Sequence, residues 1–257
     1  MAGCYSENAS CNDSTVVEFM GLPAAGKSRL ANEVARLLRA EGTIVTEPSN
    51  ALDARSPRLH RVASKLLLAG RTYARRPLLS HRWICAVARS RQKSKAQMIA
   101  KLIYWFSLVE TMNRSVRYAG VHVFDQGLFQ ALWSLAYDAR ELNLADAGLR
   151  AQLAATYAST HTVIICVNVQ PESLLLRLRS RHGMSRLDRD IRCHSAARIK
   201  RAHEDLQRVR ATAVSIAGDL QPPGSLHLID IDNEGSVADA ARTIAEHLSW
   251  RGQNNAA

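Results

Sequence analysis

Residues 21–28 of the chain, GLPAAGKS, have the spacing G-x-x-x-x-G-K-S, which builds a phosphate-binding loop. In such a loop a glycine-rich turn directs backbone N–H groups at the phosphates of a nucleotide. Lys27 would reach the β- and γ-phosphates, and the Ser28 hydroxyl would bind Mg²⁺. We therefore predict that the nucleotide contacts Gly21, Ala24, Ala25, Gly26, Lys27, Ser28 and Arg29.

The flanking sequence supplies the elements that such a loop needs. The apolar, partly β-branched run at 16–20 predicts a strand immediately before the loop. After the loop, apolar residues recur at helical spacing up to Gly42, a common helix stop. A helix that starts at the loop adds the partial positive charge of its N-terminus to the phosphate site.

The rest of the chain alternates predicted strands with helices. Further strands are expected at 43–46, 121–124, 162–169 and 226–231. This alternation predicts an α/β fold, a doubly wound parallel sheet of about five strands, in one domain over 16–250. Ligands of such a sheet bind at the carboxyl ends of its strands.

Charged residues follow three of the predicted strands. Glu47 ends the second strand and Asp125 the third, so both carboxylates are expected at the ligand-binding edge. Arginines gather around Gly183, after the helix that follows the fourth strand, which favours contact with an anion. These arginines are Arg177, Arg179, Arg181, Arg186 and Arg189.

In this order and spacing the chain resembles the P-loop small-molecule kinases of the thymidylate kinase and deoxynucleoside kinase group. IVTEPS is similar to their Glu-Pro motif, and VHVFDQG to their strand that ends in Asp-Arg. VNVQPESLLLRLRSRHGMSRLDRD resembles their strand, helix and arginine-bearing lid. HLIDIDNEGSVADAARTIAEHL resembles their closing strand and helix. The resemblance implies a P-loop NTPase fold with a helical acceptor region and an arginine lid.

The resemblance also implies roles for single residues. Lys27 and Ser28 would hold ATP and Mg²⁺, and Asp125 would lie near the metal or accept the acceptor's proton. Glu47 would act as a general base on the acceptor. The lid arginines Arg177, Arg181 and Arg186 would offset the charge of the transferred phosphoryl group. Asn233 and Glu234 would flank the adenine.

One motif departs from the family pattern. Gln126 follows the aspartate, where the family has an arginine that contacts the acceptor. A thymidine-type acceptor is therefore in doubt. The segment 54–118 is expected to be a helical, basic insertion on the acceptor side, and its part 54–109 is longer and far more basic than a nucleoside pocket needs.

The net charge of +11 comes from one part of the chain. Between Asp53 and Glu110 there are thirteen Lys or Arg residues and no acidic residue. The segment is interpreted as a solvated helix surface, as a site for an anionic acceptor, or as a surface for nucleic acid or an anionic membrane. The few aromatic residues speak against nucleic acid.

Three functions remain open at this level. The favoured hypothesis is an ATP- and Mg²⁺-dependent kinase that phosphorylates a small, anionic nucleotide-, nucleoside- or sugar-like acceptor. The alternative is a nucleotide-switched ATPase that binds nucleic acid or membrane through 54–109, and a weaker one is a sulfotransferase. Tails are expected at 1–15 and 251–257, and the five cysteines, with no C-x-x-C pair, predict a cytoplasmic protein. A homodimer is compatible with the sequence.

Overall fold

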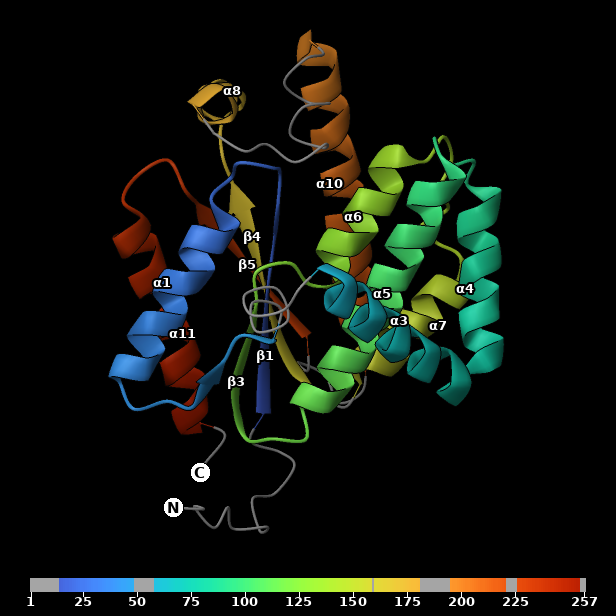
Figure 1. Cartoon of the computed structure of the whole chain (residues 1–257). Helices are drawn as coiled ribbons and strands as arrows, with labels where there is room; N and C mark the ends of the chain where they lie inside the picture. The colour runs from blue at the N-terminus through green and yellow to red at the C-terminus, as the bar shows by residue number, and fades with distance from the viewer. Residues whose placement is uncertain (1–13, 49–57, 159, 181–194, 221–225, 255–257) are drawn as a thin grey trace.

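A computed structural model describes residues 14–48, 58–158, 160–180, 195–220 and 226–254. Its centre is a five-stranded sheet in the order β2-β3-β1-β4-β5, with every neighbouring pair parallel. The predicted fold class, a doubly wound parallel sheet, is therefore confirmed (Figure 1). The strands are β1 (Ser14–Gly21), β2 (Val45–Thr46), β3 (Gly120–Phe124), β4 (His161–Asn168) and β5 (Leu226–Asp232).

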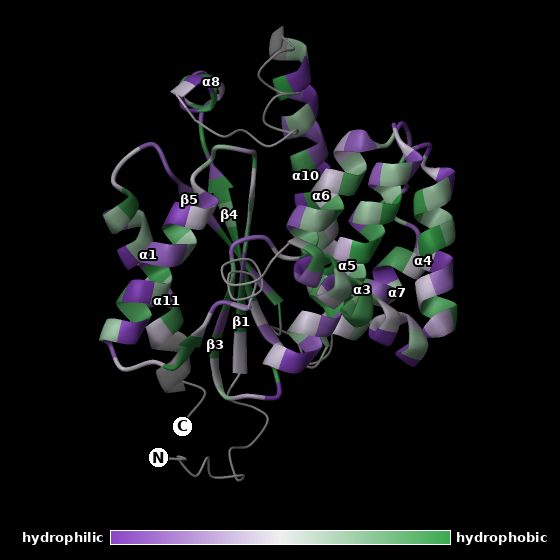
Figure 2. Cartoon of the chain, in the orientation of Figure 1, coloured by the Kyte–Doolittle hydropathy of each residue, from purple (hydrophilic) through white to green (hydrophobic). Residues whose placement is uncertain are grey.

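Helices cover both faces of the sheet (Figure 1). One face carries α1 (Lys27–Ala40) and α11 (Val237–Asn254), and Figure 2 shows the green and purple bands of amphipathic helices. The other helices are α3 (Arg58–Arg75), α4 (Pro77–Arg89), α5 (Lys95–Ser115), α6 (Leu128–Asp138), α7 (Ala147–Tyr157), α8 (Pro171–Ser180) and α10 (Ser195–Asp219). Among these, α5, α6, α7 and α10 build the layer on the opposite face.

The apolar core is divided by the sheet. Side chains of β1 alternate between its two faces, so Val17 and Phe19 pack with Leu30 and Val34 of α1. Val16 and Met20 face the larger cluster, which holds Trp83, Trp105 and Trp133 and most of the other buried aromatic rings. Strand β4 is apolar over almost its whole length, because both of its faces are covered. The phosphate loop thus starts from a central strand held on both sides.

Three details of the predicted boundaries were wrong. Strand β1 begins at Ser14, which pairs with Gly120, so two residues assigned to the N-terminal tail belong to the sheet. Helix α11 continues to Asn254, four residues into the predicted C-terminal tail. Strand β2 is only Val45–Thr46, at the edge of the sheet, where it pairs with Val121 and His122 of β3.

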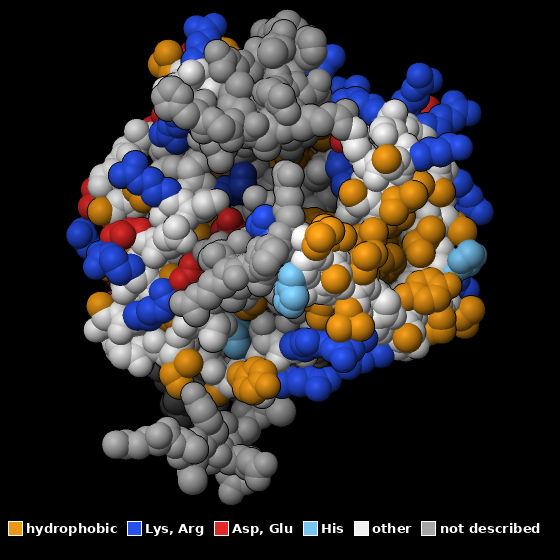
Figure 3. Space-filling model, in the orientation of Figure 1, with side chains coloured by type: hydrophobic (Ala, Val, Ile, Leu, Met, Phe, Trp, Pro, Cys, Tyr) orange, Lys and Arg blue, Asp and Glu red, His pale blue; other side chains and the backbone are white. Residues whose placement is uncertain are grey.

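The described part of the basic segment is helical, as expected, and consists of α3, α4 and α5. Helix α3 packs along α5, and α5 in turn packs on α6. Much of α3 faces solvent, including Leu59, Val62 and Leu66, whose exposed fractions are 86%, 57% and 49%. Figure 3 shows this apolar surface with Lys and Arg side chains gathered below it. In the described part of the chain no helix is both long enough and apolar enough to cross a membrane.

Candidate functional site

The phosphate loop connects the end of β1 to the first turn of α1. It contains two left-handed residues, Ala24 with φ 64° and Gly26 with φ 92°. A left-handed alanine is uncommon, and such outliers cluster at functional sites. Left-handed residues within a tight turn are the feature from which concave, anion-binding nests of backbone N–H groups are built. The loop therefore has the backbone of an anion site.

Both glycines of the motif are required by close contacts. A Cβ atom on Gly21 would lie 2.6 Å from the carbonyl oxygen of Val167 in β4. A Cβ atom on Gly26 would lie 2.5 Å from Nδ2 of Asn233, which follows β5. Val167 and Asn233 therefore leave no space for a side chain at either position, which accounts for glycine at both.

Lys27, Ser28 and Asp125 meet beside the loop. The Lys27 ammonium donates hydrogen bonds to the carbonyl oxygens of Gly21 and Leu22, each at 2.8 Å, and so lies over the loop. The Ser28 hydroxyl donates to Oδ2 of Asp125 at 2.9 Å. Asp125 follows β3 directly, and β3 is the neighbour of β1. The predicted pair of metal-binding side chains is therefore adjacent.

This pair fits the ligand chemistry of Mg²⁺. The ion prefers oxygen ligands and is usually held by one or two protein groups, the phosphates of the substrate and water. One hydroxyl and one carboxylate beside a phosphate loop meet that requirement. The described residues contain no group of three or more His, Cys, Asp or Glu side chains that could hold a metal by themselves.

Arg177 and Asn233 close the loop from the other side. The guanidinium of Arg177, in α8, donates to the carbonyl oxygen of Asn233 at 2.6 Å and to that of Ala25 at 3.5 Å. The Asn233 amide also donates to the Ala25 carbonyl, at 2.7 Å. Glu234 accepts a hydrogen bond from the amide of Gln170. A contact of Asn233 or Glu234 with adenine stays a prediction.

Three of the predicted catalytic residues are not placed at the loop. Arg181 and Arg186 lie outside the described residues. Glu47 follows β2, and its carboxylate forms an ion pair with Arg39 of α1 at 2.7 Å. It is not among the described residues that line the cavity at the loop. The role of Glu47 as a base stays a prediction.

A cavity of about 820 Å³ adjoins the phosphate loop. Its described lining comes from three parts of the fold, namely the loop, the helices α5 and α6 with the segment before α6, and the end of α8. The loop and the start of α1 contribute Pro23, Ala24, Gly26, Lys27, Ser28 and Arg29. Helices α5 and α6 and the segment before α6 contribute Ala100, Lys101, Tyr104, Gln126, Gln130, Ala131, Trp133 and Ser134. Helix α8 contributes Arg177 and Ser180. This volume is typical of small-molecule sites.

The side of the cavity away from the loop is largely uncharged. Of the thirteen basic residues between Asp53 and Glu110, its described lining includes Lys101 alone. The Lys101 ammonium is paired with Oδ2 of Asp138 at 2.5 Å, and because Asp138 also pairs with Lys93 at 3.2 Å, it offsets part of the Lys101 charge. Tyr104, Gln126 and Ser134 offer an aromatic ring and neutral hydrogen-bonding groups. The structure thus separates most of the basic segment from this cavity.

Sequence reasoning missed two side chains that fix the loop. Gln130, in the first turn of α6, accepts a hydrogen bond from the Gly21 amide at 2.9 Å through its Oε1 atom. Glu18, in the middle of β1, is 1% exposed and accepts a hydrogen bond from the Tyr157 hydroxyl at 2.7 Å. A lone acidic residue in the apolar run VVEFM was a signal, because a buried carboxylate needs partners. Its partner lies 139 residues away, beyond the reach of local patterns.

The Glu18 carboxylate occupies the contact between β1 and the start of α6. A Cβ atom on Gly127 would lie 2.0 Å from Oε2 of Glu18, so only glycine fits there. Burial raises the pKa of Glu18 to about 7, against the opposing effects of Tyr157 and of the Phe129 and Leu128 amides. The Oε2 atom of Glu18 makes no hydrogen bond within the described part of the chain. Glu18 therefore positions Gly127, two residues after Asp125.

Comparison with known proteins gives similarity of fold only. No protein-family model matches the chain, and no curated protein has a similar sequence. Among solved structures, it is similar to shikimate kinase from Acinetobacter baumannii in complex with shikimate, with 11% identity and a TM-score of 0.46, over 93% of this chain and 94% of that one. It is also similar to the EHV4 thymidine kinase complexed with TP4A, with 13% identity and a TM-score of 0.42, over 91% and 90% of the two chains. At this level of similarity the function has to be inferred from the site itself.

Replacing Glu18 by glutamine should change how stability depends on pH. The folded protein keeps the Glu18 proton up to a pH of about 7, whereas the unfolded chain releases it near 4.5. The unfolded state is therefore favoured as the pH rises through this window, by up to about 3 kcal/mol. Glu18→Gln should lose less stability than the wild type between pH 4.5 and 7. Chemical denaturation at several pH values measures this difference.

The matched control for this measurement is Glu246→Gln, because Glu246 lies on the exposed side of α11. Its free energy of unfolding should follow the wild-type pH dependence. Parallel curves for Glu18→Gln and the wild type would show that the buried carboxyl does not hold its proton as described.

Proposed function

We propose that the protein is an ATP- and Mg²⁺-dependent phosphotransferase that moves the γ-phosphate to a hydroxyl group of a small acceptor. The observation that carries this proposal is the Ser28–Asp125 hydrogen bond, beside a phosphate loop that opens on a cavity with uncharged polar groups. A nucleotide switch needs the loop and a metal site, but it has no need of a second substrate cavity. The volume of about 820 Å³ has room for an acceptor beside the phosphates.

The donor is held by the loop, the start of α1 and Lys27. Backbone N–H groups and the helix N-terminus would bind the phosphates, with the Lys27 ammonium at the β- and γ-phosphates. Ser28 and Asp125 would hold Mg²⁺, which supplies neutralisation of the phosphate charge when it is bound. Arg177 lies against the carbonyl of Ala25 and would offset charge that develops on the transferred group.

The acceptor would bind between the loop and helices α5 and α6. Tyr104, Gln126 and Ser134 line this part of the cavity, and Asp138 offsets part of the charge of Lys101. These groups suit an acceptor with hydroxyl groups and an uncharged body. The anionic acceptor expected from the basic segment is therefore less well supported than a neutral, sugar- or nucleoside-like one.

Proton transfer from the acceptor is assisted by a general base near its hydroxyl group, a role that a carboxylate can fill. Asp125 lies at the cavity edge through its hydrogen bond with Ser28, so its carboxylate is the nearer candidate. Glu47 is held by Arg39, at the end of the edge strand. We infer that Asp125 both contributes to the metal site and orients the acceptor, while Glu47 has a secondary role.

Substitutions at Lys27 and Asp125 test the proposal. Lys27→Ala should abolish ATP binding, because it removes the charge over the loop. Asp125→Asn should retain ATP binding and lower the rate of ADP formation by about a hundredfold or more, because it removes charge at the metal and acceptor. Thermal-shift titration with ATP measures binding, and a coupled ADP assay with sugars, nucleosides and nucleotides measures turnover.

Control variants for these measurements are Lys200→Ala and Asp239→Asn, whose side chains are 79% and 69% exposed. Both should behave as the wild type does. Wild-type turnover in Asp125→Asn would refute the role of the carboxylate, and normal ATP binding by Lys27→Ala would refute the phosphate loop. ADP formation that no acceptor increases, but RNA or anionic vesicles do, would favour the nucleotide switch.

Gln126 provides a separate test of the acceptor cavity. It is exposed, it lines the cavity, and it precedes Gly127, whose position depends on Glu18. Gln126→Ala should raise the KM for the acceptor about tenfold and leave the KM for ATP unchanged, because one hydrogen-bonding group is lost. Steady-state kinetics with each substrate varied in turn measures both constants. Equal changes in the two constants would contradict an acceptor-specific contact.

A further inference from the structure

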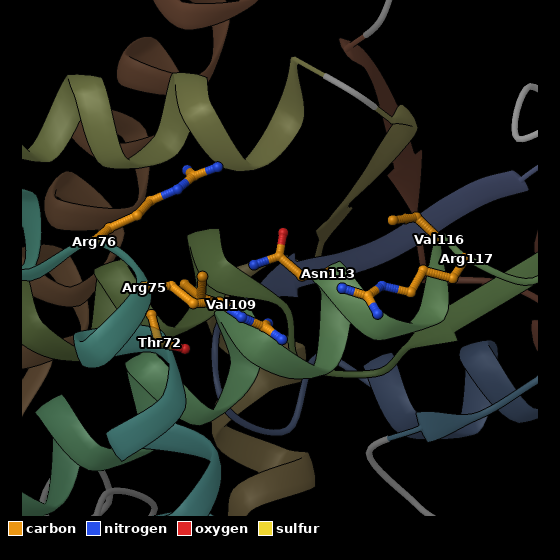
Figure 4. A pocket seen from close by; sticks show the side chains of 7 residues that line it. All are labelled: Thr72, Arg75, Arg76, Val109, Asn113, Val116 and Arg117. Carbon is orange, nitrogen blue, oxygen red and sulfur yellow. The ribbon is translucent and has the colours of Figure 1, made fainter.

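A second group of basic side chains surrounds two cavities that the phosphate loop does not touch. Cavities of about 370 and 470 Å³ adjoin each other and share Arg75 and Arg117 in their lining. Figure 4 shows the first cavity, with Arg75 at the end of α3, Asn113 in α5, Arg117 just beyond α5, and Arg76 extending toward α7. We call this region the arginine pocket, and its basic residues are Arg71, Arg75, Arg76, Arg114 and Arg117.

The arginine pocket lies at the opposite edge of the sheet from the phosphate loop. Helix α5 ends at Ser115, and β3 begins at Gly120, so Arg117 is next to the amino end of β3. Gly120 is paired with Ser14 of β1, whereas the loop begins at Gly21. Ser14 and Gly21 are seven residues apart along β1, which corresponds to a distance of about 23 Å. A small acceptor at the loop cannot reach these arginines.

Positive charge in the pocket exceeds the negative charge beside it. Glu110 is fully buried, and its carboxylate pairs with Arg75 at 2.5 Å and with Arg114 at 2.9 Å. Arg76 donates to the carbonyl oxygen of Ala155 in α7. Within the described residues, the guanidinium groups of Arg71 and Arg117 make no hydrogen bond or ion pair. One carboxylate therefore faces five guanidinium groups.

Helix ends explain only part of this arrangement. Arginines are favoured near helix C-termini, where they meet the last carbonyl groups and the negative end of the dipole. Here the ends of α3 and α5 lie together, yet the guanidinium groups of Arg71 and Arg117 bond to no described carbonyl. Both side chains line a cavity instead. Like charges held together around a cavity repel one another unless an anion binds between them.

We propose that the arginine pocket binds a phosphoryl group of a second ligand, distinct from the nucleotide and the acceptor. Guanidinium groups bind phosphate oxygens in a bidentate manner. Arg71 and Arg117 line the cavity, and the N–H groups of their guanidiniums could form such contacts. Asn113 and Tyr118 line the same cavities and add neutral hydrogen-bonding groups. The proposal is independent of the kinase activity, because it uses no residue of the loop or its cavity.

Two sources could supply such a phosphoryl group, a soluble phosphorylated compound or the headgroup of a lipid. Both present the same chemistry to the arginines. Helix α3, which carries Arg71 and Arg75, also exposes Leu59, Val62 and Leu66 to solvent (Figure 3). An exposed apolar face beside basic residues is a feature of helices that lie on anionic membranes. The experiment therefore includes both sources.

Isothermal titration with inorganic pyrophosphate, without Mg²⁺, tests the site. The wild type should bind two equivalents, one at the phosphate loop and one in the arginine pocket. Lys27→Ala should retain the second equivalent only. The double variant Arg71→Gln/Arg117→Gln should retain the first and lose at least tenfold in affinity for the second, because two charged hydrogen-bond donors are removed.

The chosen variants keep the buried ion pairs intact. Arg71 and Arg117 do not pair with Glu110, so replacing them leaves no unpaired buried carboxylate. Arg89→Gln is the matched control, because Arg89 is exposed in the last turn of α4 and lines neither cavity. It should bind both equivalents as the wild type does. Equal melting temperatures of all variants show that the fold is retained.

Flotation with phosphatidylcholine vesicles, with and without phosphatidate, identifies the source. Binding to phosphatidate vesicles that is lost in Arg71→Gln/Arg117→Gln supports the pocket and assigns a lipid headgroup. Pyrophosphate binding in the pocket without vesicle binding supports it and assigns a soluble ligand. A single pyrophosphate equivalent that Lys27→Ala removes, together with no arginine-dependent vesicle binding, would overturn the proposal.

Discussion

The buried carboxylate of Glu18 is the contact on which the geometry of the candidate site depends. It lies against Gly127 and the Tyr157 hydroxyl, where β1 meets the start of α6. Removing an ionised carboxylate from water costs free energy, and burial therefore raises the pKa of Glu18 to about 7. Because β1 leads into the phosphate loop and Gly127 lies two residues after Asp125, this one contact relates the position of the loop to that of the Asp125 carboxylate.

Parallel strands then bring the other groups together. Loops that follow β1, β3 and β5 meet at one edge of the sheet, as the contacts of Ser28 with Asp125 and of Asn233 with Ala25 show. Glycine at 21 and 26 allows the neighbouring backbone and side chain to come within van der Waals range of the loop. The phosphate loop is therefore closely packed against its neighbours, and donors held in this way are suited to electrostatic stabilisation of an anion.

Sequence patterns predicted the elements that depend on local chemistry. The loop motif, the parallel α/β class and the position of Asp125 after a strand follow from spacing and periodicity, and the structure contains all three. Contacts between distant segments were not predictable, such as Gln130 with Gly21, which are 109 residues apart. The basic segment shows the same limit, since its composition does not reveal that Lys101 lines the cavity while Arg71 lies at the other edge.

Phosphorus NMR of a reaction with ATP and Mg²⁺ tests the central claim most directly, because it follows the γ-phosphate itself. With neutral hydroxyl compounds as acceptors, the account predicts a new phosphomonoester resonance that grows in proportion to ADP. The growth should require both the acceptor and the intact Ser28–Asp125 pair. ADP accompanied only by inorganic phosphate, with every acceptor tested, would contradict transfer and leave the loop as a site of hydrolysis.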